Sequence, residues 1–384
     1  MALIPLSRRR FIRGLGATTL GLALPGSLWC KEPTSLGLFI GTYTNGSSEG
    51  IYHGRLNLEN GAMTDLTLAA PATNPSFLAL HPGGSFLYAV GEAGGGSVSA
   101  FAIDGPSGAL TLLNSQSTHG GGPCHLSVDP SGQWVAVANY GGGSLALLPL
   151  TAEGPLKAAT HVVQHQGQGA DPRRQRGPHA HCVMPDAAGR FIFAADLGLD
   201  KVLAYHLDRD QGRLDPHPTT PWVALSPGAG PRHFTFHPNG RFAYVVNEFD
   251  SSVTALSYDP DSGALQALQT VSALPASYAE TSYGADIHLR PDGRFLYASN
   301  RGHDSIAVFS VDAQTGLLTA QGHASTLGHW PRNFTIDPSG AFLLVANQRS
   351  NSVVSFRIDP TSGALSPTGH TLDVGAPVCL QWGP

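Results

Sequence analysis

Between residues 36 and 384, short apolar runs alternate with polar turns at a nearly regular spacing. In the stretch from Gly228 to Asp250, Phe234–Phe236 ends one predicted strand, and Arg241–Val246 alternates in β-forming residues as a second. The intervening His-Pro-Asn-Gly sequence is typical of a tight turn, because proline fixes φ and glycine adopts conformations that other residues avoid. The pattern predicts an antiparallel hairpin whose open end carries polar side chains.

This hairpin pattern recurs along the chain. A turn of the form Pro-x-Gly-x-aromatic, or a close variant, has its glycine at Gly84, Gly132, Gly189, Gly240, Gly293 and Gly340. A strand beginning with Ser or Lys and then Val or Ile generally follows, and after it a turn resembling Asp-x-x-x-Gly-x-Leu, so that each unit contains four strands. Four short strands in about 50 residues are typical of one blade of a β-propeller.

The two ends of the repeat complement each other. The segments 38–43, 50–56 and 61–63 fit the second to fourth strands of a further unit that has no first strand, and 377–382 forms a lone strand. We therefore predict an all-β domain over residues 36–384: a seven-bladed β-propeller whose ring is closed by the C-terminal strand joining the N-terminal blade. A β-solenoid, the alternative, would be an open array and would not explain the complementary ends.

Polar residues that vary between units predict a site on one face of the ring. The turns after the first and third strands are uniform, whereas the connections on the other face differ from unit to unit. Eight positions before the turn glycines lie Ser76, Cys124, His181, Arg232, Ala285 and Arg332; eight positions after them lie Glu92, Tyr140, Leu197, Glu248, Arg301 and Gln348. Since first strands line the axis of a propeller, we expect His181, Arg232 and Arg332 at its mouth, beside Glu248 and Arg301.

This set of side chains suggests chemistry on an anion or an oxyanion. The forked donors of arginine match carboxylate and phosphate groups, and a histidine or glutamate can activate water. The alternative is an ion-pair network in which Glu248 neutralises Arg232 or Arg301 and holds adjacent blades together. We assign catalytic roles to His181, Glu248, Arg232 and Arg301.

Further residues are predicted to bind substrate: Asp196, His233, His288, Asn300 and Arg332. Asn300 lies at a repeated asparagine position where Asp196 is the counterpart, and a side chain that caps the strand end is the structural alternative there. For His233 the alternative is packing. The polar segment 164–177 contains three arginines; we interpret it as a solvated insertion rather than a lid.

Composition narrows the possible partners. Charged residues make up only 13% of the chain and the net charge is −5, which argues against nucleic-acid binding. Four cysteines do not form a disulfide framework in a chain of 384 residues, so buried free thiols are favoured over a Cys124–Cys182 bridge. Since no Cys/His spacing matches a zinc site, we predict no metal and no cofactor.

Residues 1–30 form a separate segment. Ser7-Arg8-Arg9-Arg10-Phe11 precedes an apolar run from Gly14 to Leu28, as in a twin-arginine export signal. A basic tail followed by a fortuitous apolar run is the alternative. The run is too short for a stable membrane span. The segment predicts a periplasmic protein that engages the twin-arginine export machinery.

Several motifs together resemble those of the propeller lactonase family, which includes bacterial 6-phosphogluconolactonases and a fungal carboxymuconate-lactonizing enzyme. The similar stretches are Phe39–Thr44, Gly177–His181, Ala195–Asp200, Gly228–His233, Val246–Glu248, Ser299–Gly302 and Trp330–Arg332. The resemblance implies an active site at His181, Arg232, Glu248 and Arg301. It also implies hydrolysis of a small-molecule sugar lactone, 6-phosphogluconolactone or a related aldonolactone, to the open-chain acid.

Two other functions fit the same residues. One is a non-catalytic propeller that binds an anion or a protein at its arginine-lined mouth, and the other is a lactonizing cycloisomerase acting on a carboxylated muconate. The export signal departs from the cytoplasmic location expected for a pathway enzyme acting on a phosphorylated sugar, which puts the phosphate in doubt. We expect a monomer.

Overall fold

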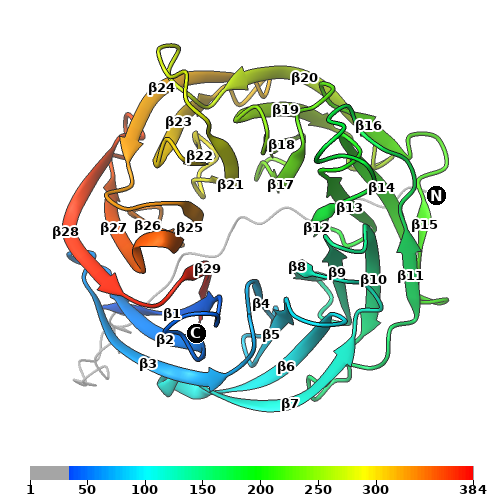
Figure 1. The fold of residues 1–384 in the computed structure, drawn as a ribbon, viewed down its shortest axis with the longest axis horizontal. Coiled ribbons are helices and arrows are strands. Elements are labelled where there is room, and N and C mark those ends of the chain that lie inside the picture. Colours follow the sequence, from blue (N-terminus) through cyan, green and yellow to red (C-terminus); the bar gives the residue numbers. More distant parts are fainter. Residues whose placement is uncertain (1–33, 384) are drawn as a thin grey trace, which may run out of the picture. The chain divides into compact units, whose positions relative to one another are not determined.

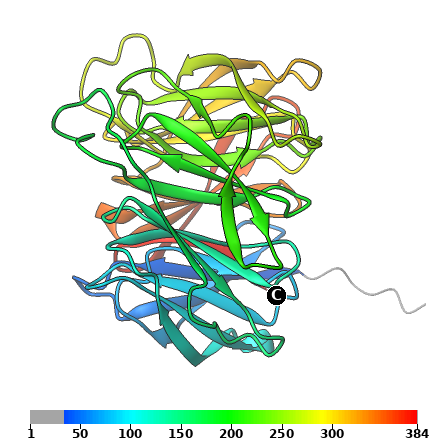
Figure 2. The same ribbon diagram turned by 90° about the vertical axis from the view of Figure 1, so that its right-hand side faces the viewer.

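The computed structural model describes residues 34–383, and within them seven β-sheets surround a central axis (Figure 1). The predicted export signal and Cys30 lie outside the described residues. Seen from the side, the strands run between the two faces of the ring and the loops gather at those faces (Figure 2). The prediction of a seven-bladed β-propeller is confirmed.

Each blade is an antiparallel sheet whose first strand lies nearest the axis. From the axis outward, the first complete blade contains β4 (Leu78–Leu80), β5 (Phe86–Gly91), β6 (Ser97–Asp104) and β7 (Ala109–Ser117). The second contains β8 (Pro123–Val128), β9 (Trp134–Asn139), β10 (Ser144–Pro149) and β11 (His161–Gln164). The third contains β12 (Ala180–Pro185), β13 (Phe191–Asp196), β14 (Lys201–Asp208) and β15 (Arg213–Pro216), and β16 (Trp222–Ala224) also pairs with β14. The next three contain β17 (Pro231–Phe236), β18 (Phe242–Asn247), β19 (Ser252–Tyr258) and β20 (Leu265–Ser272); β21 (Tyr283–Leu289), β22 (Phe295–Arg301), β23 (Ser305–Val311) and β24 (Leu318–Ser325); and β25 (Pro331–Ile336), β26 (Phe342–Asn347), β27 (Ser352–Ile358) and β28 (Leu365–Asp373). Two 3₁₀ turns, η1 (Gly105–Ser107) and η2 (Gln348–Ser350), interrupt this pattern.

The seventh blade combines the two ends of the chain. Its strands are β29 (Pro377–Trp382), β1 (Ser35–Thr42), β2 (Gly50–Asn57) and β3 (Met63–Pro71). Strand β29 pairs antiparallel with β1, and Leu380 lies opposite Ile40. This pairing closes the ring as predicted and gives β1 a partner strand on both sides.

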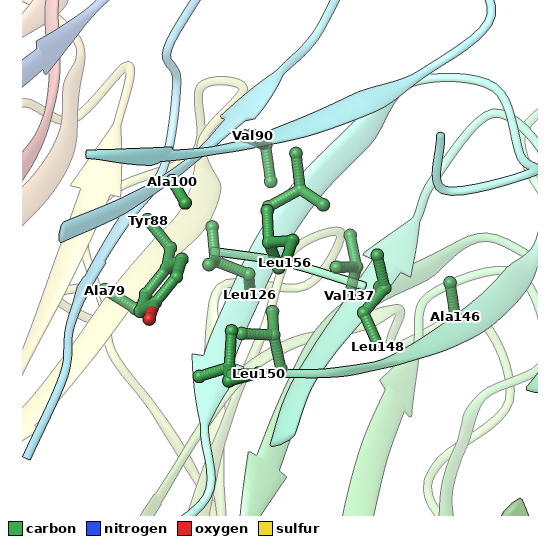
Figure 3. Packing of buried hydrophobic residues seen from close by; sticks show 12 residues of the cluster. Ala79, Tyr88, Val90, Ala100, Leu126, Val137, Ala146, Leu148, Leu150 and Leu156 are labelled. Carbon is green, nitrogen blue, oxygen red and sulfur yellow. The ribbon is translucent and has the colours of Figure 1, made fainter. Parts of the chain in front are cut away.

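The core lies between neighbouring sheets. Between the sheets β4–β7 and β8–β11, Tyr88, Val90, Leu126, Val137 and Leu148 pack together and are almost fully buried (Figure 3). The hydroxyl of Tyr88 donates a hydrogen bond of 2.9 Å to the carbonyl of Gly154 in the next blade. Such contacts give every blade an apolar partner on both faces, so that neighbouring blades stabilise one another.

The uniform turns have a structural role, as the sequence indicated. In the Asp-x-x-x-Gly turn of the blade containing β23, Gly316 has a φ of +73°, and a Cβ atom there would lie 2.4 Å from the ring of Phe242 in the preceding blade. Gly363 repeats this contact with Phe295 one blade further on, again at 2.4 Å. Glycine is needed at these two positions for both its conformation and its lack of a side chain. These turns therefore pack neighbouring blades against each other, which is a structural role.

In the described part of the chain, no helix is long and apolar enough to cross a membrane. Cys124, Cys182 and Cys379 are buried there and form no disulfide, in agreement with the prediction of free thiols.

Candidate active site

A polar pocket of about 340 Å³ opens at the face where first strands begin and second strands end. Its lining comes from the six complete blades, β4 to β28, and from the connection between β11 and β12. The lining residues are Glu92, Cys124, Tyr140, Arg174, His181, Glu248, Tyr283, Arg301, Trp330 and Arg332. Most of them occupy the variable positions that the spacing from the turn glycines singled out, because those positions recur at the same height in every blade.

Glu248 is the centre of the charged cluster. Its carboxylate follows β18 and is 7% exposed. Oε2 lies 2.8 Å from Nη2 of Arg301 and 3.2 Å from Nε of Arg232, while Oε1 lies 3.1 Å from Nη2 of Arg174. One carboxylate therefore contacts three guanidinium groups that come from two strands and a loop.

The charges around Glu248 determine its protonation. Burial alone would raise the pKa of this carboxyl, but Arg301 and Arg232 more than offset burial and lower the pKa to about 2. Glu248 is therefore ionised at neutral pH, when it carries no proton that it could donate. A carboxylate with so low a pKa is also a weak base.

Arg232 lies behind Glu248 and is not one of the residues that line the pocket. It is 2% exposed and donates a hydrogen bond from Nη1 to the carbonyl of Ala285 on β21. Burial, together with Arg301 and Arg332, lowers the pKa of Arg232 to about 9, so the group remains a cation at neutral pH. Its position suits a residue that fixes Glu248 rather than one that contacts substrate.

His181 reaches the pocket from β12. Its Nδ1 lies 3.7 Å from Sγ of Cys124, and its ring packs edge-on against Tyr140 and His233, with centroid distances of 5.5 and 5.3 Å. Burial and the nearby Arg232 hold the pKa of His181 well below its ordinary value of 6.5. The imidazole is therefore neutral at pH 7 and has a nitrogen lone pair available to accept a proton.

A second carboxylate, that of Glu92, also lines the pocket. Its Oε2 accepts hydrogen bonds from the hydroxyls of Tyr43, at 2.9 Å, and Ser76, at 2.5 Å. The guanidinium of Arg332 lies 5.5 Å from the centre of the Tyr43 ring. Burial lowers the pKa of Arg332, but Tyr43 and Glu92 outweigh burial and raise it, so Arg332 remains charged.

Four of the residues predicted to bind substrate do not line this pocket. Asp196 is fully buried, and its carboxylate accepts hydrogen bonds from Nδ1 of His165 at 2.6 Å and from the backbone N–H of His179 at 2.8 Å. The amide of Asn300 donates to the carbonyl of Ala273 at 2.7 Å and to Oγ of Ser305 at 3.3 Å. These contacts match the structural alternative, a side chain that caps the strand end.

His233 and His288 do not line the pocket and share one partner. Nδ1 of His233 is 2.7 Å from Oδ1 of Asp286, and Nε2 of His288 is 3.0 Å from Oδ2 of the same carboxylate. Burial and Arg232 lower the pKa of His233 to about 4. This polar group joins the first strands of two adjacent blades. Of the predicted substrate-binding residues, only Arg332 lines the pocket.

The interpretation of segment 164–177 as a solvated insertion is correct for most of its residues, which are exposed, but it missed the contacts that three of its side chains make. Arg174 extends from it into the pocket and lies 4.7 Å above the ring of Phe249. His165 and Gln175 are buried, and Gln175 donates to the carbonyl of Leu197 and to the carboxylate of Asp200, each at 2.7 Å. Its side chains therefore anchor the segment over the mouth. The three arginines in the segment were the sequence feature that could have indicated a contact with the pocket. Because the segment lies outside the repeat, counting from a turn glycine cannot predict where these side chains lie.

The comparisons with known proteins agree with this geometry. The family described as "Lactonase, 7-bladed beta-propeller" matches residues 37–382. A 6-phosphogluconolactonase of Bacillus subtilis is 41% identical over 300 residues, 78% of this chain and 84% of that protein, and a 6-phosphogluconolactonase of Formosa agariphila is 38% identical over 307 residues, 78% of this chain and 86% of that protein. The structure of a periplasmic gluconolactonase of Pseudomonas aeruginosa superposes with a TM-score of 0.87 at 35% identity, covering 91% of this chain and 99% of that one. The chain therefore belongs to the seven-bladed β-propeller lactonase family.

Proposed function

We propose that this protein hydrolyses a sugar lactone of the gluconolactone type to the open-chain aldonic acid, in the pocket at the mouth of the ring. The observation that carries the proposal is a buried carboxylate held by three arginines beside a neutral histidine. Ester hydrolysis needs a group that takes a proton from water and cations that face the developing oxyanion. The identities to lactonases support the same substrate class.

His181 serves as the proton acceptor in this proposal. Water adds to the lactone carbonyl carbon as His181 takes one of its protons, and the carbonyl oxygen becomes an oxyanion. The bond between this carbon and the ring oxygen then breaks, and His181 returns the proton to the ring oxygen. Although the resting imidazole is a weak base, the negative charge that forms beside it raises its affinity for the proton.

The arginines divide between two roles. Arg301 and Arg332 line the pocket and face the oxyanion or an anionic group of the substrate. Glu248 contacts Arg301 and offsets part of its charge, and the buried Arg232 holds Glu248 in position. Arg232 is thus a positioning residue in this scheme.

The test compares two substrates with the purified protein lacking residues 1–30. Opening of glucono-1,5-lactone and of its 6-phosphate is followed by acid release in a pH-stat, and spontaneous hydrolysis is subtracted. We expect acceleration of at least one lactone, and the faster one defines whether phosphate is part of the substrate. If neither is accelerated while the protein is folded and binds gluconate 6-phosphate, the protein is a binding propeller instead.

We also propose that residues 1–30 direct export to the periplasm through the twin-arginine machinery. The sequence Ser7-Arg8-Arg9-Arg10-Phe11 supports this, as does the likeness to a periplasmic gluconolactonase. Changing Arg8 and Arg9 to Lys should retain the protein in the cytoplasmic fraction, whereas Arg13→Lys should leave export intact. Equal periplasmic levels of the paired variant and the wild type would argue against this route.

Size-exclusion chromatography of the exported protein should give the mass of a monomer.

A further inference from the structure

A second hollow of about 670 Å³ adjoins the pocket, and the two share Arg174 and Tyr283 as lining residues. Three connections on the same face of the ring enclose it: segment 164–177, the turn after β18, and the connection between β20 and β21. Its lining residues are Asp171, Arg173, Arg174, Phe249, Asp250, Ser251, Leu274, Glu280, Thr281, Ser282 and Tyr283. A substrate extending out of the pocket past Arg174 therefore enters a space larger than the pocket itself.

The lining of this hollow suits an uncharged polyol ring. Phe249, Leu274 and Tyr283 supply apolar surface, while Asp171, Asp250 and Glu280 supply carboxylate acceptors for hydroxyl groups. The hydroxyl of Ser251 is buried and has no hydrogen-bond partner within residues 34–383. Buried polar groups are generally satisfied, so Ser251 is a candidate partner for a ligand or a water bound there.

The charges of the hollow disfavour a second anion. Of its two arginines, Arg174 is paired with Glu248, and the side chain of Arg173 is 87% exposed and lies 3.9 Å from Asp171. A phosphate placed here would therefore face carboxylates, including that of Glu280, whose repulsion outweighs what the one remaining arginine offers. A glycosyl group carries no charge, so the carboxylates do not repel it.

We infer that this hollow is a subsite for a second, uncharged sugar ring, so that the enzyme accepts 1,5-lactones of aldobionic acids, in which a glycosyl group is attached to gluconolactone. The inference rests on the proposed lactone hydrolysis and names a wider substrate class for the same site. The reaction is unchanged: water opens the lactone ring, and the glycosidic bond stays intact. A monosaccharide lactone fills the pocket and leaves the hollow to solvent.

The experiment measures kcat/KM for maltobiono-1,5-lactone and glucono-1,5-lactone with the folded protein. Thr281 is exposed and lines the hollow but not the pocket, so Thr281→Trp fills the subsite with a bulky ring. Ala276 is exposed on the same connection and lines neither space, which makes Ala276→Trp the matched control. We expect wild type to accelerate both lactones. The ratio of kcat/KM for the maltobiono- over the gluconolactone should fall at least about 10-fold in Thr281→Trp, a loss of about 1.4 kcal/mol, and should hold in Ala276→Trp.

The possible failures are distinguishable. If wild type accelerates gluconolactone but not maltobionolactone, or if Thr281→Trp leaves the ratio unchanged, the subsite is overturned and lactone hydrolysis stands. If neither lactone is accelerated but glucono-1,5-lactone 6-phosphate is, the subsite is overturned and lactone hydrolysis stands. If none of the three is accelerated, the proposed function is overturned, and this inference with it. As a check that does not depend on turnover, maltobionate should inhibit gluconolactone opening more strongly than gluconate does, and equal inhibition would contradict a second-ring subsite.

Discussion

Glu248→Gln is expected to lower kcat/KM for lactone opening by about 100-fold, the size of effect found when one charge-stabilising group is removed from an active site. The carboxylate contacts Arg301, Arg232 and Arg174, and a neutral amide cannot balance three cations or hold them in place. Glu153→Gln is the matched control, since Glu153 is exposed and lies outside the pocket. Activity near that of wild type in a folded Glu248→Gln protein would contradict the role assigned to this group.

The same variant is expected to be less stable. Arg232 and Arg301 are 2% and 5% exposed, and removing the partner of a buried charge typically costs about 3–5 kcal/mol. Urea unfolding followed by tryptophan fluorescence should therefore show a free energy of unfolding lower by roughly 3 kcal/mol than in Glu153→Gln. An unchanged free energy would mean that the arginines find other partners.

The low pKa of Glu248 gives this stability a pH dependence with a definite sign. Because folding lowers the pKa of Glu248 from 4.5 to about 2, its ionised form stabilises the folded state fully above pH 4.5, and this contribution is lost as the pH falls toward 2. Wild type should therefore lose more stability over this interval than Glu248→Gln does. Parallel stability curves for the two proteins would contradict the assignment.

His181→Asn is expected to lower kcat by about 1,000-fold and to change KM little, because asparagine keeps the polar volume but cannot take a proton from water. Turnover by wild type should be constant around pH 7. It should fall only well below pH 6.5, where the neutral form of His181, whose pKa is lowered by burial and Arg232, becomes protonated. The residual activity of the variant should lack this acid limb.

The control for this substitution is His119→Asn. His119 is exposed and has a φ of +53°, a conformation that asparagine tolerates well. Both rates and pH profiles are measured with spontaneous hydrolysis subtracted at every pH. An acid limb that persists unchanged in His181→Asn would assign the titrating group elsewhere, and Glu92 would then be the first residue to substitute.

The sequence left open whether the charged cluster is an active site or an ion-pair network that holds blades together. The pairs exist, since Glu248 contacts both Arg232 and Arg301. They also form the wall of a pocket, and Arg301 lines it together with His181. The structural interpretation and the functional one therefore describe the same side chains: the network fixes the positions that the chemistry would use.

The closed ring and the height of each residue within it follow from the repeat pattern alone. The glycine turns set the hydrogen-bond register near the turn of each first hairpin, and counting from Gly240 places Arg232 and Glu248 at the open end of one, where a register shift falls between Pro231 and His233. The strand at 377–382 and the missing first strand of the N-terminal unit likewise determine the closure. Local turn geometry and alternation of period two are sufficient for these conclusions, because both act over a few residues.

Which of the equivalent positions face the pocket depends on contacts that the sequence pattern does not contain. Asp196 and Asn300 occupy equivalent positions in their blades, yet their side chains turn to His165 and Ser305 instead of entering the pocket. Arg174 enters it from a connection outside the repeat, held by contacts that Gln175 makes with residues more than 20 positions away. Register propagates along paired strands, whereas the path of a non-repeating loop depends on side-chain contacts between blades, which exist only after the ring has closed.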